Sequence, residues 1–399
     1  MKRTQKAYPI LVGLLAGLLI SAAALTALFG GFSGLRSALK YAAVLRVFRA
    51  SFVADYDMEA VTDSAMEGAV EGLEDRWSYY MNAEEYASYQ DYAANRYQGI
   101  GVTVQKDEET GGFLIVTVNK DGPAMTAGLV PGDIILAVDG VDVTEGETTD
   151  LRALIQADYG QDALITVRHE DGAVEADIPV SCEVIYSSPV TYELLESGTG
   201  YISLANFREG SAQDAIDAVE DLMAQGAVRL VFDVRNDPGG QLTELTALLD
   251  YLLPEGEIFI RSDKYGKETI ETSDAACVEL PMAVIVNGES YSAAEFFAAA
   301  LREYDWALVV GEPTTGKARS QVTVALSDGS AVHLSKYRYL TPNRVDLYAV
   351  GGIVPDVEIA LTEEERTDLD TGWLEPAEDP QVMAAEDALL QAEIDGAGA

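Results

Sequence analysis

The stretch over residues 282–321 constrains the fold of this chain more than any other. It begins with an apolar run, 282–286, which predicts a buried strand, and a turn at Asn287-Gly288 follows. An alanine-rich pattern of helical period then starts at Ser292, and a second apolar run leads into a glycine-containing turn that carries Lys317. Strand, turn, helix and strand in this order predict an α/β fold with functional loops at the carboxyl ends of strands.

The same alternation of strands and helices begins at Gly200. A strand-like segment precedes a helical pattern over 212–224, and a buried-strand run over 230–234 ends in the turn with Gly239-Gly240. A further helix is predicted from about 243 to 253. We therefore predict a mixed α/β core over 186–360 with a partly parallel central sheet.

The N-terminus has a different character. No charged residue occurs from Ala7 to Leu35, a run longer than the roughly 20 residues that span a bilayer. Lys2, Arg3 and Lys6 precede this run, so residues 1–35 predict a cytoplasmic N-terminus and a transmembrane anchor, with the body outside the cytoplasm. A cleaved signal peptide, which would give a secreted protein, is the competing interpretation.

Composition excludes several kinds of site. The chain holds 26 Lys and Arg against 67 Asp and Glu, so it should repel nucleic acid, which we do not expect as a partner. Cys182 and Cys277 form no CxxC motif, which argues against a disulfide framework and a zinc site. His169 and His333 are the only histidines, both in strand-like sequence, and no HExxH motif occurs. We therefore expect neither a metal nor a cofactor.

Three further segments complete the predicted organisation. Residues 36–92 predict a helical N-terminal segment, because Val61, Ala65 and Ala69 recur at four-residue spacing. Residues 361–399 form an acidic C-terminal segment with one helix over about 381–392. Residues 93–185 predict a compact β-module with short helices over 124–127 and 151–157.

This β-module resembles a PDZ domain. The sequence QGIGVTV is followed at the expected distance by GPAMTAGLVPGDIILAVDG. In that family the loop equivalent to Gly99, Ile100, Gly101 and Val102 presents backbone N–H groups to the terminal carboxylate of a peptide, which adds as a strand to the sheet. A small β-domain without a ligand is the alternative.

Ser292 and Lys317 offer the groups that peptide hydrolysis needs. A serine at a helix start can present its hydroxyl beside unpaired N–H groups, which bind an anion. A lysine can take its proton only when neutral, which burial favours. Gln321 could hold the lysine without adding charge, and the N–H groups of Gly239 and Ala293 are candidate oxyanion donors. Taken alone, a helix-capping serine and a solvated lysine explain the same residues.

Five segments carry a resemblance that favours the catalytic interpretation. They are GYISLANF, LVFDVRNDPGG, VNGESYSAAE, VGEPTTGKARSQ and GGIVPDVEI, in this order behind the PDZ-like module. Together they resemble the C-terminal processing peptidases, the tail-specific serine proteases of family S41, over roughly residues 55–395. The resemblance implies Ser292 as nucleophile, Lys317 as general base and Gln321 as the residue that positions it, with Gly239 and Ala293 as oxyanion donors.

The resemblance also implies a membrane-anchored serine endopeptidase that cleaves protein substrates near C-terminal tails recognised by the PDZ domain. In that family the N-terminal helical segment commonly serves in dimerisation, so a homodimer is one expectation. An inert PDZ scaffold that binds tails at the membrane is the alternative. Departures from the family pattern bear on the substrate subsites and the resting state; they are Glu289, Tyr291, Pro313, Thr315 and Ala318-Arg319.

Overall fold

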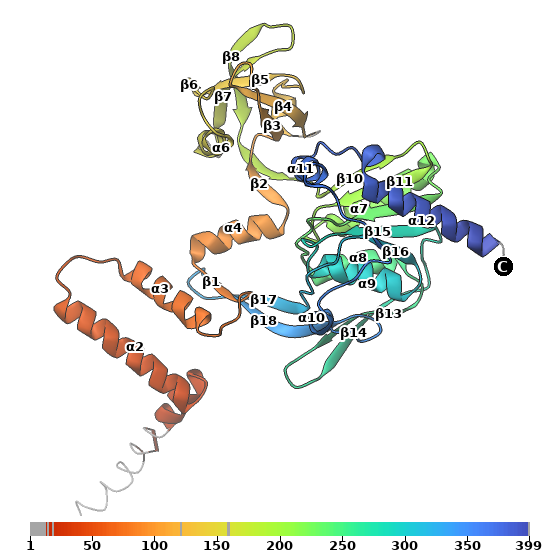
Figure 1. The fold of residues 1–399 in the computed structure, drawn as a ribbon. Helices are drawn as coiled ribbons and strands as arrows, with labels where there is room; N and C mark the ends of the chain where they lie inside the picture. Colours follow the sequence, from red (N-terminus) through yellow and green to blue (C-terminus); the bar gives the residue numbers. More distant parts are fainter. Residues whose placement is uncertain (1–12, 14–15, 18–19, 120–121, 158–159, 398–399) are drawn as a thin grey trace, which may run out of the picture. The chain divides into compact units, whose positions relative to one another are not determined.

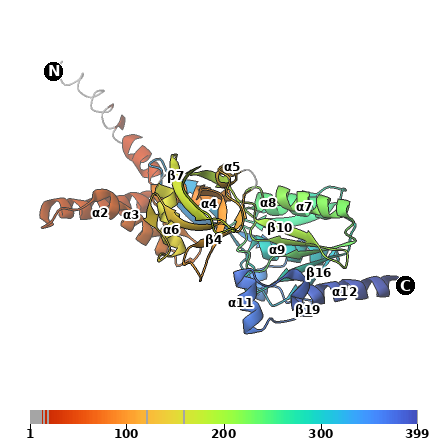
Figure 2. The same cartoon turned by 90° about the horizontal axis from the view of Figure 1, so that it is seen from above.

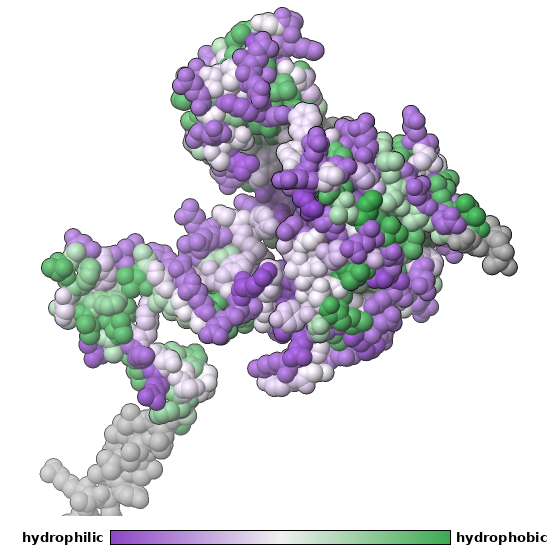
Figure 3. Space-filling model, viewed as in Figure 1, coloured by the Kyte–Doolittle hydropathy of each residue, from purple (hydrophilic) through white to green (hydrophobic). Residues whose placement is uncertain are grey.

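The computed structural model of this chain describes residues 13, 16–17, 20–119, 122–157 and 160–397 (Figure 1). It divides into two compact units, Met1–Gly68 and Ala69–Ala399. The first unit contains a helix over Ile20–Leu28 and α2 (Phe32–Ser51), and α3 (Met58–Glu71) begins in it. Figure 3 shows hydrophobic side chains gathered over these helices, and Phe32, Leu39 and Val47 of α2 are exposed.

The predicted membrane anchor finds no support in the described helices. Among the residues that the structure describes, no single helix is both long and apolar enough to cross a bilayer. Ile20–Leu28 and α2 pass that criterion only as a pair, with a bend of 83° between them. Residues 1–12, 14–15 and 18–19 of the predicted anchor lie outside the described residues.

Residues 102–181 form an antiparallel sheet with two short helices, α5 (Pro123–Thr126) and α6 (Thr148–Ala157). Phe113, Ile115 and Ile165 are fully buried beneath it, because side chains alternate between the two faces of a strand. The two-stranded pair β2 (Arg96–Gly99) and β9 (Glu183–Tyr186) flanks this module. The strands of the antiparallel sheet over residues 102–181, in spatial order, are β3 (Val102–Lys106), β4 (Phe113–Val118), β5 (Ile134–Val138), β7 (Asp162–Arg168) and β8 (Val174–Ser181), with β6 (Val141–Asp142) paired to β5.

A six-stranded, mostly parallel sheet forms the predicted α/β core. Only β10 runs antiparallel to its neighbour, and the other pairs are parallel. Parallel neighbours bring their carboxyl ends to one edge of the sheet, which is where the loop with Gly239 and the loop with Ser292 begin. The strand order is β10 (Val190–Leu194), β11 (Thr199–Leu204), β12 (Arg229–Asp233), β15 (Met282–Val286), β16 (Ala307–Gly311) and β19 (Val357–Glu358).

Helices cover both faces of this sheet (Figure 2). α7 (Ser211–Gln225), α8 (Leu242–Leu252) and α9 (Ala293–Glu303) pack on one face through a buried cluster that includes Phe232 and Phe297. α12 (Pro380–Ala397) packs on the other face. Every residue of β12 and β15 is buried, because a strand that is covered by helices on both faces of the sheet exposes neither face to water.

A second, antiparallel sheet lies beside the α/β core, and one of its strands corrects a prediction. Tyr79–Met81 form a strand, β1, whereas helix was predicted throughout 36–92. Helical periodicity does continue in α4 (Ala83–Ala93), but Tyr80 and Met81 are buried by pairing with β18, a partner that local sequence does not reveal. The sheet consists of β1, β18 (Ala331–Leu340), β13 (Gly256–Ser262) and β14 (Glu268–Ser273), with β17 (Arg319–Ala325) paired to β18.

The C-terminal segment contains more structure than one helix. Within residues 361–399, α11 (Glu363–Thr371) and a 3₁₀ turn over Pro376–Glu378 precede α12, and before this segment α10 (Leu347–Val350) precedes β19. Thr362 caps α11 by accepting a hydrogen bond from the Glu365 N–H at 3.2 Å, and the Glu365 carboxylate accepts from the Thr362 N–H at 2.7 Å. This is a capping box, which starts a helix even where the sequence is too polar to show a buried face.

Candidate active site

Ser292 lies where the chain leaves β15 and enters α9. It is the residue directly before the helix and keeps only 8% of its surface exposed. Its φ is +52°, a left-handed value that costs a non-glycine residue about 1–3 kcal/mol and that clusters at functional sites. The turn therefore holds the serine at the helix start, as the sequence predicted.

Glu295 connects this serine to the loop that carries Lys317. Its side chain is fully buried and accepts a hydrogen bond from the Ser292 N–H at 3.0 Å. The same carboxylate accepts from the N–H groups of Gly316 at 2.6 Å and Lys317 at 2.8 Å, and from the Thr314 hydroxyl at 2.6 Å. One buried anion thus fixes the start of α9 and the loop after β16 against each other.

Lys317 is half-buried in a setting that favours its neutral form. Burial lowers the pKa of the Lys317 ammonium, and the positive charge of Arg76 lowers this pKa further. The Glu295 carboxylate acts in the opposite direction. A depressed pKa is what a lysine needs in order to act as a base near neutral pH.

The Lys317 ammonium contacts an aromatic ring rather than the serine. Its Nζ lies 4.0 Å from the centroid of the Trp77 ring, and the Arg76 guanidinium lies 4.2 Å from the same centroid. Among the described residues, no hydrogen bond joins Lys317 Nζ to the Ser292 hydroxyl or to Gln321. This cation–π contact holds the ammonium at the Trp77 ring rather than at the serine hydroxyl.

One cavity nevertheless brings the predicted residues together. Its volume is about 410 Å³, and Ser292, Lys317, Gln321 and Gly239 all line it. Gln321 lies in β17, where its Nε2 donates to the Arg319 carbonyl at 3.0 Å and to the Ser335 hydroxyl at 3.1 Å. Aromatic rings form much of the remaining wall; they are Tyr79, Tyr89, Tyr92, His333, Tyr337 and Tyr339.

Gly239 approaches Ser292 more closely than any larger residue could. Its φ is +85°, and a Cβ placed there would lie 2.9 Å from the Ser292 Cβ and 2.9 Å from the Ala293 nitrogen. The two predicted oxyanion donors therefore flank the serine. The Ala293 N–H, at the first turn of α9, has no acceptor among the described residues.

The Gly239 N–H, by contrast, is already occupied. It donates to Asp237 Oδ1 at 2.7 Å, while Asp237 Oδ2 has no hydrogen-bond partner among the described residues. Asp237 is fully buried, and burial raises the pKa of its carboxyl well above the ordinary value, although the positive charge of Arg208 opposes this. Burial therefore favours the protonated carboxyl, the Gly239 hydrogen bond acts against it, and Asp237 occupies one of the two predicted oxyanion donors.

Three residues that shape this site, Glu295, Trp77 and Asp237, were not predicted from the sequence. Glu295 has a local signal, because Ser292-x-x-Glu295 is the spacing of a capping box. Trp77 and Asp237 have no comparable signal, since their contacts depend on tertiary structure. Tyr291, which departs from the family pattern, hydrogen-bonds the Glu289 carboxylate and does not line the cavity.

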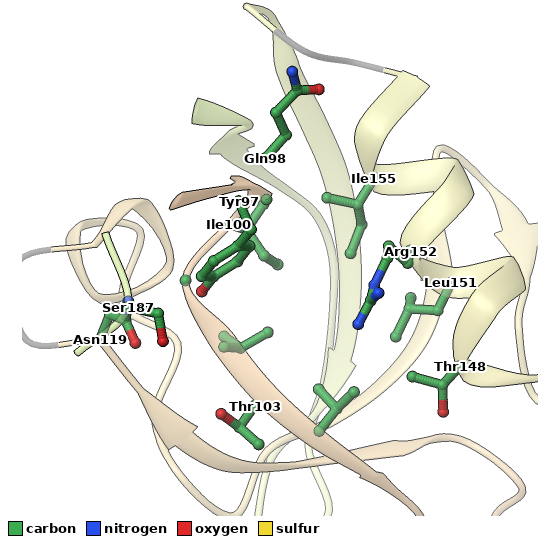
Figure 4. A pocket seen from close by; sticks show the side chains of 14 residues that line it. Tyr97, Gln98, Ile100, Thr103, Asn119, Thr148, Leu151, Arg152, Ile155 and Ser187 are labelled. Atoms are coloured by element: carbon green, nitrogen blue, oxygen red, sulfur yellow. The ribbon is translucent and has the colours of Figure 1, made fainter. Parts of the chain in front are cut away.

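The predicted peptide-binding loop borders a second cavity, of about 300 Å³ (Figure 4). Gly99, Ile100, Gly101 and Val102 all line it, and Ile100 is buried. Within the described residues, no hydrogen bond uses the N–H groups of Ile100 and Gly101. Both donors are therefore available to a carboxylate.

Comparisons with known proteins agree with the resemblance in the motifs. The model for peptidase family S41 matches residues 198–359, and a PDZ domain model matches residues 114–169. The chain is 30% identical over 307 residues to the carboxy-terminal processing protease CtpA of Bacillus subtilis, covering 76% of this chain and 65% of that protein. A probable CtpA-like serine protease of Staphylococcus epidermidis is 29% identical over 306 residues, with 76% and 61% covered.

A solved structure shares the fold. It is a putative S41 protease from Bacteroides fragilis, with a TM-score of 0.55, 18% sequence identity, and 86% of this chain and 93% of that chain covered. At this identity the likeness concerns the fold alone. The chain spans between 61% and 65% of the length of the two bacterial relatives above.

Proposed function

We propose that this chain, which carries a peptidase family S41 domain and a PDZ domain, is a serine endopeptidase that cleaves protein substrates near their C-termini. The observation that carries the proposal is the single cavity lined by Ser292, Lys317, Gln321 and Gly239. These residues come from separate loops and strands, and a buried carboxylate, Glu295, ties two of those loops together.

The chemistry follows from these positions. Neutral Lys317 accepts the proton of the Ser292 hydroxyl while the oxygen attacks the peptide carbonyl. The Ala293 and Gly239 N–H groups stabilise the oxyanion that forms. Collapse of this intermediate releases the amine, which takes the proton from the Lys317 ammonium. Water then hydrolyses the acyl-enzyme, with Lys317 again as base.

The arrangement described above is a resting state in this proposal. Two movements precede catalysis: Lys317 Nζ leaves the Trp77 ring and turns toward Ser292, and the Gly239 N–H turns from Asp237 toward the substrate. Gln321 is a positioning residue that holds the lysine after it has turned. Each movement exchanges one existing contact for one with the substrate or the nucleophile, so neither requires refolding of the core.

Substitution of the nucleophile and the base tests the proposal. Ser292→Ala and Lys317→Ala should each abolish cleavage of an unstructured protein substrate with an apolar C-terminus, at unchanged far-UV circular dichroism. Ser327→Ala and Lys264→Ala, which change exposed residues away from the cavity, serve as matched controls. Near wild-type turnover in either site variant would refute the Ser-Lys assignment.

An inert PDZ scaffold that binds C-terminal tails is the second candidate. The occupied Gly239 N–H and the stacked Lys317 favour it, because neither is in a catalytic position. Incubation of the chain with casein over a range of pH separates the two candidates, with Ser292→Ala as the control. Tail binding without hydrolysis at every pH would favour the scaffold.

We also propose that residues 7–35 anchor the chain in the cell membrane, with the body extracytoplasmic. The support is the uncharged apolar run behind Lys2, Arg3 and Lys6. N-terminal sequencing of the mature protein tests it, since a start near residue 25–35 would mean a cleaved signal peptide. A homodimer through the N-terminal helices is part of the same proposal, and sedimentation of the full chain with and without residues 1–57 tests it.

A further inference from the structure

The PDZ groove contains a charged side chain whose position bears on which C-terminal tails the groove accepts. This inference rests on the proposed function, in which the groove recognises the tail of a substrate. Fourteen residues line the groove, and Arg152 is the only charged one among them. Figure 4 shows its side chain extending from α6 into the space between the helix and β3.

No carboxylate among the described residues is paired with Arg152. Within the described part of the chain it makes no ion pair, although the protein contains 67 acidic residues. By contrast, Arg235, Arg302 and Arg366 are each paired with a carboxylate. An exposed, unpaired guanidinium beside an open groove retains its full capacity to bind an incoming carboxylate.

The orientation of α6 relative to β3 follows from two contacts. Gln156, near the end of α6, donates from its side chain to the Gln98 carbonyl at 3.3 Å, beside the peptide-binding loop. Lys106, at the far end of β3, donates to the Gly146 carbonyl at 2.6 Å, just before α6 begins. α6 and β3 are therefore antiparallel. Residues further toward the start of α6 lie beside residues further toward the end of β3.

A tail bound in this groove has a defined register. Its terminal carboxylate meets the N–H groups of Ile100 and Gly101, and the peptide runs along β3 as an added strand. Side chains of a strand alternate, so the last residue and the residue two before it both face α6, about 6.6 Å apart. Ile155 and Arg152, one turn apart on α6, are separated along the helix by about 4.5 Å.

The apolar end of the groove receives the last side chain. Ile100 and Ile155 are buried there, with 2% and 6% of their surfaces exposed. The next inward-facing side chain of the tail then meets Arg152 and the Thr148 hydroxyl. We infer that Arg152 is a specificity-determining residue, which selects tails with an apolar last residue and an aspartate or glutamate two positions before it.

Peptide binding to the full chain with Ser292→Ala tests this inference without cleavage. Fluorescence anisotropy compares labelled ten-residue peptides that end in Glu-Ala-Val, Gln-Ala-Val and Ala-Glu-Val. The first should bind about three- to tenfold tighter than the second, as expected for an exposed charge-assisted contact. The third, whose glutamate faces away from α6, should gain nothing over the second.

Substitutions of Arg152 test whether this residue causes the preference for the glutamate peptide. Arg152→Gln should abolish the advantage of Glu-Ala-Val, and Arg152→Glu should reverse it in favour of Lys-Ala-Val. Arg168→Gln, which changes an arginine of the same domain that does not line the groove, should leave it intact. Equal binding of the glutamate and glutamine peptides, or a preference that survives Arg152→Gln, would overturn the inference.

A peptide with an amidated C-terminus separates this inference from the proposed function. It should lose binding whichever residue stands two positions before the end, because it lacks the terminal carboxylate. If it binds as well as the free acid, or if no peptide binds, tail recognition itself fails and the role of Arg152 fails with it. Carboxylate-dependent binding without a glutamate preference rejects only the role of Arg152.

Discussion

In the proposed mechanism Lys317 is the base, and neighbouring charges set the pH range in which it is neutral. Burial is the main cause that lowers the pKa of its ammonium, and the charge of Arg76 is the second. The base is active when neutral, so the rate should rise with pH through this pKa. The pH dependence of the proposed activity therefore depends on the charge of Arg76, an exposed residue that does not line the cavity.

Arg76→Gln should move the rising limb of the pH–rate profile to higher pH. Removal of the nearby positive charge raises the pKa of Lys317, so a smaller fraction is neutral at pH 7 and the rate there falls. The plateau at high pH should stay the same, because the fully neutral lysine is unchanged. Measurement of kcat/KM from about pH 6 to 10 checks this, with Lys264→Gln as the matched control. An unshifted limb would mean that another group titrates.

The pKa of Asp237 is raised rather than lowered, and we expect this shift to affect the stability of the fold. Its carboxyl is buried and its pKa in the folded protein is raised, so the folded state keeps a proton that the unfolded state releases. Stability is thus lost as the pH rises above the ordinary value of 3.8, toward the raised pKa. The loss is about 1.4 kcal/mol per pH unit within that window.

Asp237→Asn should remove this loss. The amide does not ionise, so the free energy of unfolding of the variant should exceed that of the wild type by a margin that grows with pH above about 4. Urea unfolding followed at several pH values up to neutrality measures the margin. Asp305→Asn, at an exposed residue, is the comparison. A margin independent of pH would show that Asp237 is ionised in the folded protein.

At the scale of elements, the candidate active site depends on how α9 is joined to the loop after β16. The Glu295 carboxylate accepts four hydrogen bonds from these two elements. A glutamine has one acceptor oxygen and directs its NH₂ group at N–H donors, so it cannot replace these bonds. Loss of charged hydrogen bonds at a buried site is costly, because the freed donors stay out of water.

Glu295→Gln should therefore destabilise the chain by about 2–4 kcal/mol and reduce kcat more than it changes KM. The reason for the split is that the groove for the tail is elsewhere, whereas Ser292 and Lys317 lose their common support. Thermal unfolding and steady-state kinetics measure both effects. Glu279→Gln, at an exposed position, is the control. Wild-type stability of the variant would contradict the role assigned to the carboxylate.

The elements also show what local sequence can and cannot predict. The strand over 282–286 and the helix after Ser292 were predicted correctly, because hydrophobic period and turn residues are local signals. The strand β1 was missed, since its partner β18 lies some 250 residues away. The hairpin of β13 and β14 was missed as well. Pairing across the fold, not propensity, defines these strands.

The same distinction applies to the site. Ser292, Lys317 and Gln321 were named from their motif, and they do line one cavity. Their present contacts could not be predicted: Lys317 stacks on Trp77, and the Gly239 N–H is bonded to Asp237. Both contacts depend on residues that meet only in the folded chain. A motif specifies the chemical groups, whereas tertiary packing decides which state they occupy.

At the scale of the whole molecule, the acidic C-terminal segment belongs to the core rather than to a solvated tail. Val382, Ala385 and Leu389 of α12 are buried against Val231 and Ile285 of the central sheet. Arg235, also buried, pairs with Asp233 at the end of β12 and with Asp379 just before α12, at 2.5 Å and 2.6 Å. This ion-pair network lies at the same edge of the sheet as the loops with Gly239 and Ser292.

A chain that ends at Asp379 should consequently lose its fold. Exposure of the sheet face that α12 covers costs about 1.5–3 kcal/mol for each large apolar side chain, and Arg235 loses its contact with Gln381. The sum of about 4–8 kcal/mol approaches the whole stability of an ordinary domain. Circular dichroism and thermal unfolding should show an unfolded or aggregated product. A chain shortened only by residues 395–399 is the control, and a cooperative, wild-type-like transition in the longer truncation would show that α12 is dispensable.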